Sequence, residues 1–215
     1  MLIRNILEES VRKFDEVKAV KWLKKKEIME RSYGELMENV VFTRKGLLAE
    51  GFEGKHIALI GTSSVEWMES YLGIITGCTT AVPLDAALPC EDLIDLLNRS
   101  DSVALFLSPK LKPYLDAFLE NCPKLQKVWM LQEEVEDAPA KVYGIGELRN
   151  AGKSASADSV CPAAEDIATI IFTSGTTGKS KGVMLTQNNL ASNVEAVKIT
   201  AEPGTAGLSV LPIHH

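Results

Sequence analysis

The residue types best suited to chemistry lie in one short polar segment between two apolar runs. The run ATIIF ends at residue 172, the ten residues TSGTTGKSKG occupy 173–182, and the apolar VML follows. Glycine lets the backbone approach an anion and turn its N–H groups towards it. The hydroxyl side chains add hydrogen-bond donors, and the two lysines add positive charge. The segment therefore predicts a loop that binds a polyphosphate.

Two other interpretations of this loop differ in what must follow it. Gly178, Lys179 and Ser180 match the end of the Walker-type pattern G-x-x-x-x-G-K-[ST], but the first glycine of that pattern falls on Thr173. A Walker-type loop also opens a helix, whereas an apolar strand is expected here, so that interpretation is disfavoured. A solvated hairpin loop is the second alternative, because Ser, Thr and Gly are common turn residues. The density of donors between two strands apolar enough to be central favours binding.

The elements around the loop predict an α/β fold. Short continuous apolar runs at 56–61, 80–84, 103–108 and 128–131 alternate with expected helices at 64–77, 89–99 and 110–121. Strands without polar alternation are buried on both faces, as in a doubly wound, mostly parallel sheet with flanking helices. Upstream, we expect a helix over 3–14, a small hairpin around Lys24–Lys26 and a helix to Gly51 opened by the capping pattern of Ser32 and Glu35.

The chain divides into three parts by composition. We expect an N-terminal α/β subdomain over 1–132 and a connecting segment without core elements over 133–166, where small residues such as those of NAGKSASADSV are frequent. The start of a second α/β layer follows over 167–215, with a helix over 187–199 and a final strand. Because the chain stops inside the apolar run LSVLPIHH, we expect it to be the truncated N-terminal part of a larger enzyme.

Composition narrows the classes of function. The net charge is −6 and the pI about 5.2, and no basic stretch is long enough to follow a phosphate backbone, so nucleic acid is not an expected partner. No run approaches the roughly 18 apolar residues of a membrane span. The four cysteines form no C-x-x-C pair, so zinc and redox motifs are absent and reduced thiols are expected. These features predict a soluble, cytoplasmic protein.

Residues 170–182 resemble the signature of the adenylate-forming (AMP-binding) superfamily, with Ser180 where proline is usual. The resemblance extends over residues 31–97, LTQNNLASN at 185–193 and LPIHH at 211–215. LPIHH is most similar to the branch that activates long-chain fatty acids. The resemblance implies the N-terminal portion of an acyl-CoA synthetase, which uses ATP and Mg²⁺ to form an acyl-adenylate from a carboxylic acid, releases pyrophosphate and passes the acyl group to coenzyme A.

The resemblance also implies roles for particular residues. The residues that it places on the ATP phosphates are Thr173, Ser174, Gly175, Thr176, Thr177, Gly178 and Lys181. It places Thr173 near Mg²⁺ as well, and His214 and His215 beside the acyl pocket. The two histidines are adjacent, so in a strand they point to opposite faces and do not readily share a metal ion.

No catalytic residue can be assigned in these 215 residues, because the family's remaining machinery matches nothing in this chain. We therefore expect the chain alone to be inactive and to self-associate through uncovered strand edges. Two alternatives stay open: an adenylation module that loads a carrier protein, and a non-catalytic fragment that binds nucleotide or a partner. Outside the loop, Lys24, Lys25 and Lys26 suggest either a solvated turn, which is favoured, or contact with anionic lipid headgroups.

Overall fold

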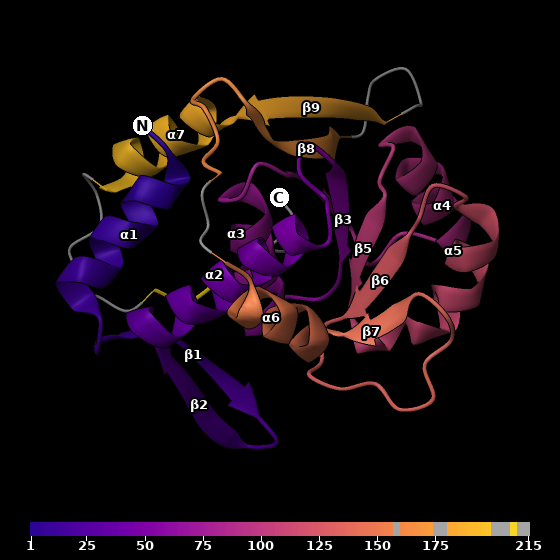
Figure 1. Ribbon diagram of the computed structural model, residues 1–215, viewed down its shortest axis with the longest axis horizontal. Helices are drawn as coiled ribbons and strands as arrows, with labels where there is room; N and C mark the ends of the chain where they lie inside the picture. The colour runs from indigo at the N-terminus through magenta and orange to yellow at the C-terminus, as the bar shows by residue number, and fades with distance from the viewer. Residues whose placement is uncertain (157–159, 174–179, 199–206, 210–215) are drawn as a thin grey trace.

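The protein is built around one seven-stranded sheet with the strand order β7-β6-β5-β3-β4-β8-β9 (Figure 1). The computed structural model describes residues 1–156, 160–173, 180–198 and 207–209. The strands in chain order are β3 His56–Ile60, β4 Thr80–Leu84, β5 Ala104–Leu107, β6 Lys127–Met130, β7 Val142–Gly144, β8 Ile167–Thr173 and β9 Lys181–Thr186. All neighbouring strands are parallel except β8 and β9, which are antiparallel. The prediction of a mostly parallel α/β sheet is confirmed.

Helices cover both faces of this sheet, because successive side chains of β3 are apolar and point to opposite faces. Ile57 and Leu59 join one buried cluster, with α2 (Tyr33–Ala49), α3 (Val65–Ile75) and α6 (Ile145–Ser154). Ala58 and Ile60 join the other, with α4 (Cys90–Arg99) and α5 (Leu115–Asn121). Every residue of β4 and β5 is buried, as expected for strands between two helical layers.

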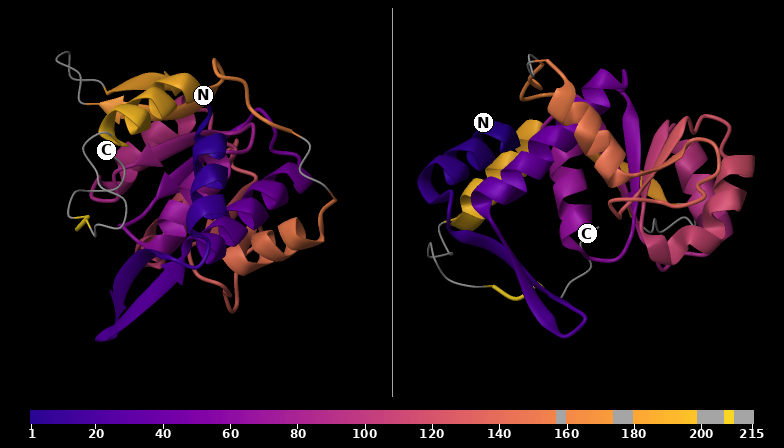
Figure 2. Two further views of the ribbon diagram at one scale, coloured as in Figure 1. Left: turned by 90° about the vertical axis from the view of Figure 1, so that its left-hand side faces the viewer. Right: turned by 60° about the horizontal axis from the view of Figure 1, so that its bottom comes forward.

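The N-terminal elements follow the sequence prediction closely. Helix α1 (Ile3–Phe14) is followed by the two-stranded hairpin of β1 (Lys18–Lys24) and β2 (Glu27–Ser32), which projects from the body of the molecule (Figure 2). The capping box is present at the start of α2. Ser32 Oγ accepts a hydrogen bond from the Glu35 N–H at 3.2 Å, and Glu35 Oε2 accepts one from the Ser32 N–H at 2.7 Å.

The prediction that 133–166 holds no core element is wrong. This segment contains β7 and α6, and Ile145 and Leu148 are fully buried. Helix α6 packs so closely on α2 that a Cβ at Gly152 would come within 1.9 Å of the Phe42 carbonyl oxygen. Gly152, one of the small residues that suggested a linker, is therefore required by the close crossing of two helices.

Two other expected elements differ in detail or fall outside the described residues. The helix expected over 110–121 begins as a 3₁₀ helix, η1 (Pro109–Tyr114), with Pro113 inside it, and continues as α5. Helix α7 (Gln187–Lys198) is present as expected. Of the expected final strand, residues 207–209 have no regular secondary structure, and 210–215 lie outside the described residues. The division of the chain at 132 and 166 stays a prediction, although β8 and β9 join the same sheet as β3–β7.

Within the described ranges, no helix combines the length and apolar character needed to cross a membrane.

Candidate functional site

The polar loop connects two antiparallel strands, and its base is well defined. Strand β8 ends at Thr173, β9 begins at Lys181, and these two residues are direct cross-strand partners. Both side chains are exposed. The structure thus brings together the two outermost residues of the predicted phosphate site. The other five predicted contacts, Ser174, Gly175, Thr176, Thr177 and Gly178, lie outside the described residues, as do His214 and His215.

The strand after the loop decides against a Walker-type site. Such a loop leads directly into a helix whose N-terminal N–H groups hold phosphate. Here Lys181–Thr186 forms β9 in an antiparallel pair with β8, and helix α7 starts only at Gln187. The loop is therefore the connection of a hairpin, as both the phosphate-binding and the solvated-loop interpretations require.

The loop follows the carboxyl end of β8, which is parallel to β4. In open α/β sheets, ligands bind outside the carboxyl ends of the parallel strands. The two strands pair only at Ala81 and Thr169, and Pro83, two residues further along β4, has no N–H to extend the ladder. Thr169 fixes the strand at this point, since its hydroxyl donates to the Ala81 carbonyl oxygen at 3.1 Å. It also hydrogen-bonds Tyr71 of α3, and burial raises the pKa of that phenol.

Arg99, at the C-terminal end of α4, contacts the base of the loop and was missed in the sequence. Its Nη2 donates to the Ser180 carbonyl oxygen at 2.5 Å, and its guanidinium carbon lies 5.6 Å from the centre of the Phe172 ring. Its Nη1 pairs with Asp95 Oδ2 at 3.0 Å. Arg99 therefore links α4 to both sides of the loop and adds a cation there. No local pattern indicates it, because 81 residues separate it from Ser180.

Gly182 follows Lys181 on the strand that leaves the loop. A Cβ at this position would come within 2.9 Å of Ile170 Cγ2 and 3.5 Å of the Phe172 ring. A side chain larger than hydrogen would therefore crowd the face of the hairpin against which Arg99 packs. The glycine that ends the polar segment has a packing role here.

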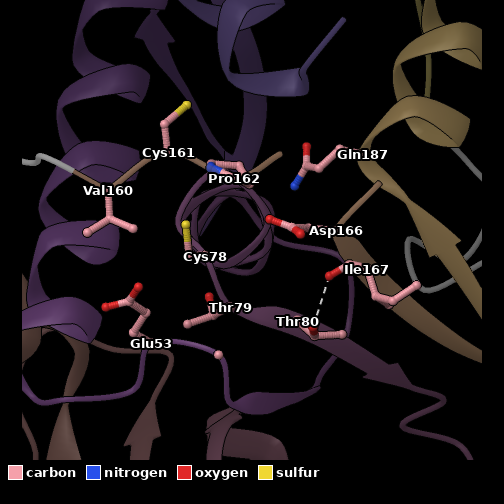
Figure 3. A pocket seen from close by; sticks show the side chains of 11 residues that line it. Glu53, Cys78, Thr79, Thr80, Val160, Cys161, Pro162, Asp166, Ile167 and Gln187 are labelled. Carbon is pink, nitrogen blue, oxygen red and sulfur yellow. Dashed lines mark hydrogen bonds between the residues drawn. The ribbon is translucent and has the colours of Figure 1, made fainter. Parts of the chain in front are cut away.

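A cavity of about 450 Å³ lies near the amino ends of β4 and β8, away from the carboxyl end that carries the loop (Figure 3). Glu53, Asp166, Cys78 and Cys161 line it. Burial, together with the nearby carboxyl groups, raises the pKa of the Cys78 thiol, so this thiol is protonated and a poor nucleophile. In the part of the chain that the structure describes, no three His, Cys, Asp or Glu side chains are grouped to hold a metal ion.

The side chain of Gln187 reaches this cavity from the start of α7. Its Nε2 donates to the Ile75 carbonyl oxygen at 2.5 Å, while its Oε1 is buried and has no partner among the described residues. The contact ties α7 to the end of α3. The cavity brings together none of the predicted site residues.

Comparison with known proteins agrees with this arrangement of hairpin, loop and parallel sheet. Residues 7–215 match the family described as AMP-binding enzyme. The chain belongs to the AMP-binding enzyme family. The resemblance of the loop and of residues 31–97 to that family is therefore confirmed, together with the fold it implies.

Curated members of the AMP-binding family that are similar to this chain include peroxisomal long chain acyl-CoA synthetase 7 of Arabidopsis thaliana, 30% identical over 194 residues. Long-chain-fatty-acid–CoA ligase 5 of Rattus norvegicus is 30% identical over 203 residues. Each match covers 86% of this chain, but only 28% and 30% of those two proteins. The chain thus spans less than a third of the length of these relatives.

Solved structures with the same fold include two CoA ligases. A putative long-chain-fatty-acid CoA ligase from Rhodopseudomonas palustris aligns over 100% of this chain and 52% of its own, with a TM-score of 0.80 and 16% identity. The anthranilate CoA ligase AuaEII in complex with anthranoyl-AMP aligns over 92% of this chain and 37% of its own, with a TM-score of 0.75 and 19% identity. At these identities the structures support the fold of the AMP-binding family.

Proposed function

We propose that this chain is the ATP phosphate-binding portion of an acyl-CoA synthetase that activates a long-chain fatty acid. The observation that carries the proposal is the hydroxyl- and glycine-rich loop whose ends, Thr173 and Lys181, pair at the carboxyl edge of the sheet. Membership of the AMP-binding family and 30% identity to two long-chain acyl-CoA ligases support it.

The proposed reaction has two steps. The carboxylate oxygen of the acid attacks the α-phosphorus of ATP, the bond from that phosphorus to the bridging oxygen breaks, and pyrophosphate leaves with the electron pair. A thiolate then attacks the acyl carbon, and AMP leaves with the electron pair of the acyl–oxygen bond. Charge accumulates on pyrophosphate in the first step, so catalysis depends on donors and cations positioned around it.

In this proposal the loop residues bind the leaving pyrophosphate. Lys181 is exposed at the first residue of β9, where a long ammonium side chain reaches a ligand without being desolvated beforehand. The hydroxyl of Thr173 is exposed at the last residue of β8 and is an oxygen donor of the kind that Mg²⁺ accepts. Bound Mg²⁺ would neutralise phosphate charge. Ser174, Gly175, Thr176, Thr177 and Gly178 complete the proposed phosphate contacts, and His214 and His215 are proposed to border the acyl group.

We do not expect the 215 residues alone to catalyse the reaction, since they span less than a third of the relatives' length. Cytoplasmic localisation stays a prediction, because the similar proteins include peroxisomal and chloroplastic ones.

A carrier-protein acceptor is the second candidate. The chain is 28% identical over 204 residues to the chloroplastic long-chain-fatty-acid–[acyl-carrier-protein] ligase AEE15 of Arabidopsis thaliana. In this alternative the first step is unchanged, and only the attacking thiol differs.

Pyrophosphate exchange into ATP by the full-length gene product, measured with a panel of acids, tests the first step. We expect exchange with long-chain fatty acids and none with amino acids. Adding coenzyme A or a holo-carrier protein to the preformed acyl-adenylate then identifies the acceptor. Nucleotide binding without exchange for any acid would contradict the synthetase proposal and favour a binding-only role.

A further inference from the structure

The β1–β2 hairpin has a base that packs on the protein and a tip that does not. At the base, Ala19 and Val20 of β1 pack against the buried cluster that contains Leu36 and Met37 of α2. Towards the tip, the two strands extend away from all other elements in each view (Figures 1 and 2). We call residues 23–28 the hairpin tip.

Two large aliphatic side chains lie side by side on the hairpin tip. Leu23 and Ile28 are direct cross-strand partners, so both point to the same face of the ribbon. They are 72% and 74% exposed, more than any other large hydrophobic residue in the described part of the chain except Leu208. Exposed apolar residues are usually scattered singly, whereas Leu23 and Ile28 lie next to each other at the end of a projecting element.

Positive charge surrounds this apolar pair. Lys24 ends β1 opposite Glu27, and Lys25 and Lys26 form the turn. Among the described residues, none of these three lysines forms a salt bridge. Nearer the base, Lys18 and Lys21 each lie 3.4 Å from a carboxylate oxygen of Glu30. Residues 18–30 hold five lysines and two glutamates, whereas the whole chain has a net charge of −6. The hairpin is thus a basic projection on an acidic protein.

We propose that the hairpin tip docks on the surface of an anionic lipid bilayer. Leu23 and Ile28 enter the interfacial layer while Lys24, Lys25 and Lys26 contact headgroup phosphates, so the apolar and charged groups meet the two layers that complement them. A nucleic acid would complement the lysines but not the aliphatic pair. The proposal goes beyond the proposed function and does not depend on it, because the contact requires neither ATP nor turnover.

Sedimentation of the chain with vesicles tests the proposal directly. We expect binding to vesicles that contain phosphatidylserine, weak binding to phosphatidylcholine alone, and loss of binding as salt rises. The triple variant Lys24→Gln/Lys25→Gln/Lys26→Gln should lower the partition coefficient about 100-fold, at about fivefold per lysine. The double variant Leu23→Ser/Ile28→Ser should lower it at least about tenfold on the same vesicles.

Matched variants outside the hairpin control for the loss of three positive charges and of two exposed apolar side chains. Lys55→Gln/Lys110→Gln/Lys112→Gln removes three exposed lysines outside the hairpin, and Val194→Ser/Val197→Ser removes two exposed valines of α7. Both should bind like the unaltered chain. Trp22 adds a site-specific readout, because the other two tryptophans, Trp67 and Trp129, are buried. Brominated phospholipids should quench the fluorescence of Trp22 when the tip is docked.

Three results would overturn the proposal. One is no binding to phosphatidylserine vesicles at low salt. Another is an equal fall of the partition coefficient in the tip variants and the control variants. The third is a dimer in sedimentation velocity without lipid that the Leu23→Ser/Ile28→Ser variant abolishes, since the tip would then contact a second copy. None of these results depends on nucleotide, so they are distinguishable from a failure of the proposed synthetase activity.

Discussion

Replacing Glu69 with alanine is predicted to destabilise the fold strongly. Glu69 lies on α3 and is fully buried, and its carboxylate accepts hydrogen bonds from three elements. Arg149 Nη2 of α6 donates at 2.8 Å and Asn39 Nδ2 of α2 at 3.1 Å, while Arg31 of β2 donates through Nη1. Among the described residues, the Glu69→Ala variant leaves the buried Arg149 guanidinium with Thr43 and the exposed Glu133 as its remaining side-chain partners.

The magnitude follows from the burial of both charges. Removing one partner of a buried ion pair costs about 3–5 kcal/mol, because the remaining charge is uncompensated. That is a large share of the 5–15 kcal/mol typical of folded domains. Replacing both partners with apolar residues, in Glu69→Leu/Arg149→Met, should recover much of the loss. The Glu30→Ala variant, which removes a half-exposed carboxylate, should change the free energy of unfolding by less than about 1 kcal/mol.

Urea unfolding followed by circular dichroism measures these changes. A loss below about 1 kcal/mol for Glu69→Ala would show that the pair contributes little and would refute the reasoning. So would a Glu69→Leu/Arg149→Met variant that is less stable than Glu69→Ala.

Two further predictions concern Arg99 and Cys122. Arg99→Ala removes the donor to Ser180 and the cation beside Phe172, so the dissociation constant for nucleotide should rise about three- to tenfold. The free energy of unfolding should change by less than about 1 kcal/mol because the side chain is partly exposed. Isothermal titration calorimetry measures the dissociation constant and urea unfolding measures the stability, each with Lys124→Ala as control, and unchanged binding would contradict the role of Arg99. Burial raises the pKa of Cys122 to about 11, so the native state keeps a proton that the unfolded state loses near its ordinary pKa of about 8.5. Stability should therefore fall between about pH 9 and 11, and a Cys122→Ala variant that falls equally over that range would disprove the assignment.

The parallel sheet and the capping box were predictable because they depend on local patterns. Continuous apolar runs such as 57–60 are typical of strands that helices cover on both faces of a sheet. The capping box of Ser32 and Glu35 can be recognised in the sequence because the two residues are three positions apart. The hairpin nature of the loop followed from the apolar strands on both sides. The change from apolar to polar residues at Thr173, and back after Gly182, indicated where the loop begins and ends.

What the sequence did not reveal depends on contacts between distant residues. Helix α6 was mistaken for a linker because it contains small residues such as Gly152, and no local propensity distinguishes a glycine needed for helix packing from one in a flexible segment. The ion network of Glu69 joins residues 31, 39 and 149, and the contact of Arg99 with Ser180 spans 81 positions. Both require the tertiary fold, since a charged residue in a helix is ordinarily read as surface.

The central claim is that the loop between Thr173 and Lys181 binds the phosphates of ATP. Pyrophosphate exchange by the full-length gene product, compared for Lys181→Ala and Lys179→Ala, tests it most directly. Loss of one charge-assisted contact of about 1.5–3 kcal/mol predicts a ten- to hundredfold fall for Lys181→Ala, with Lys179→Ala nearly unchanged. Unchanged exchange in Lys181→Ala, beside abolished exchange in Lys179→Ala, would contradict the account.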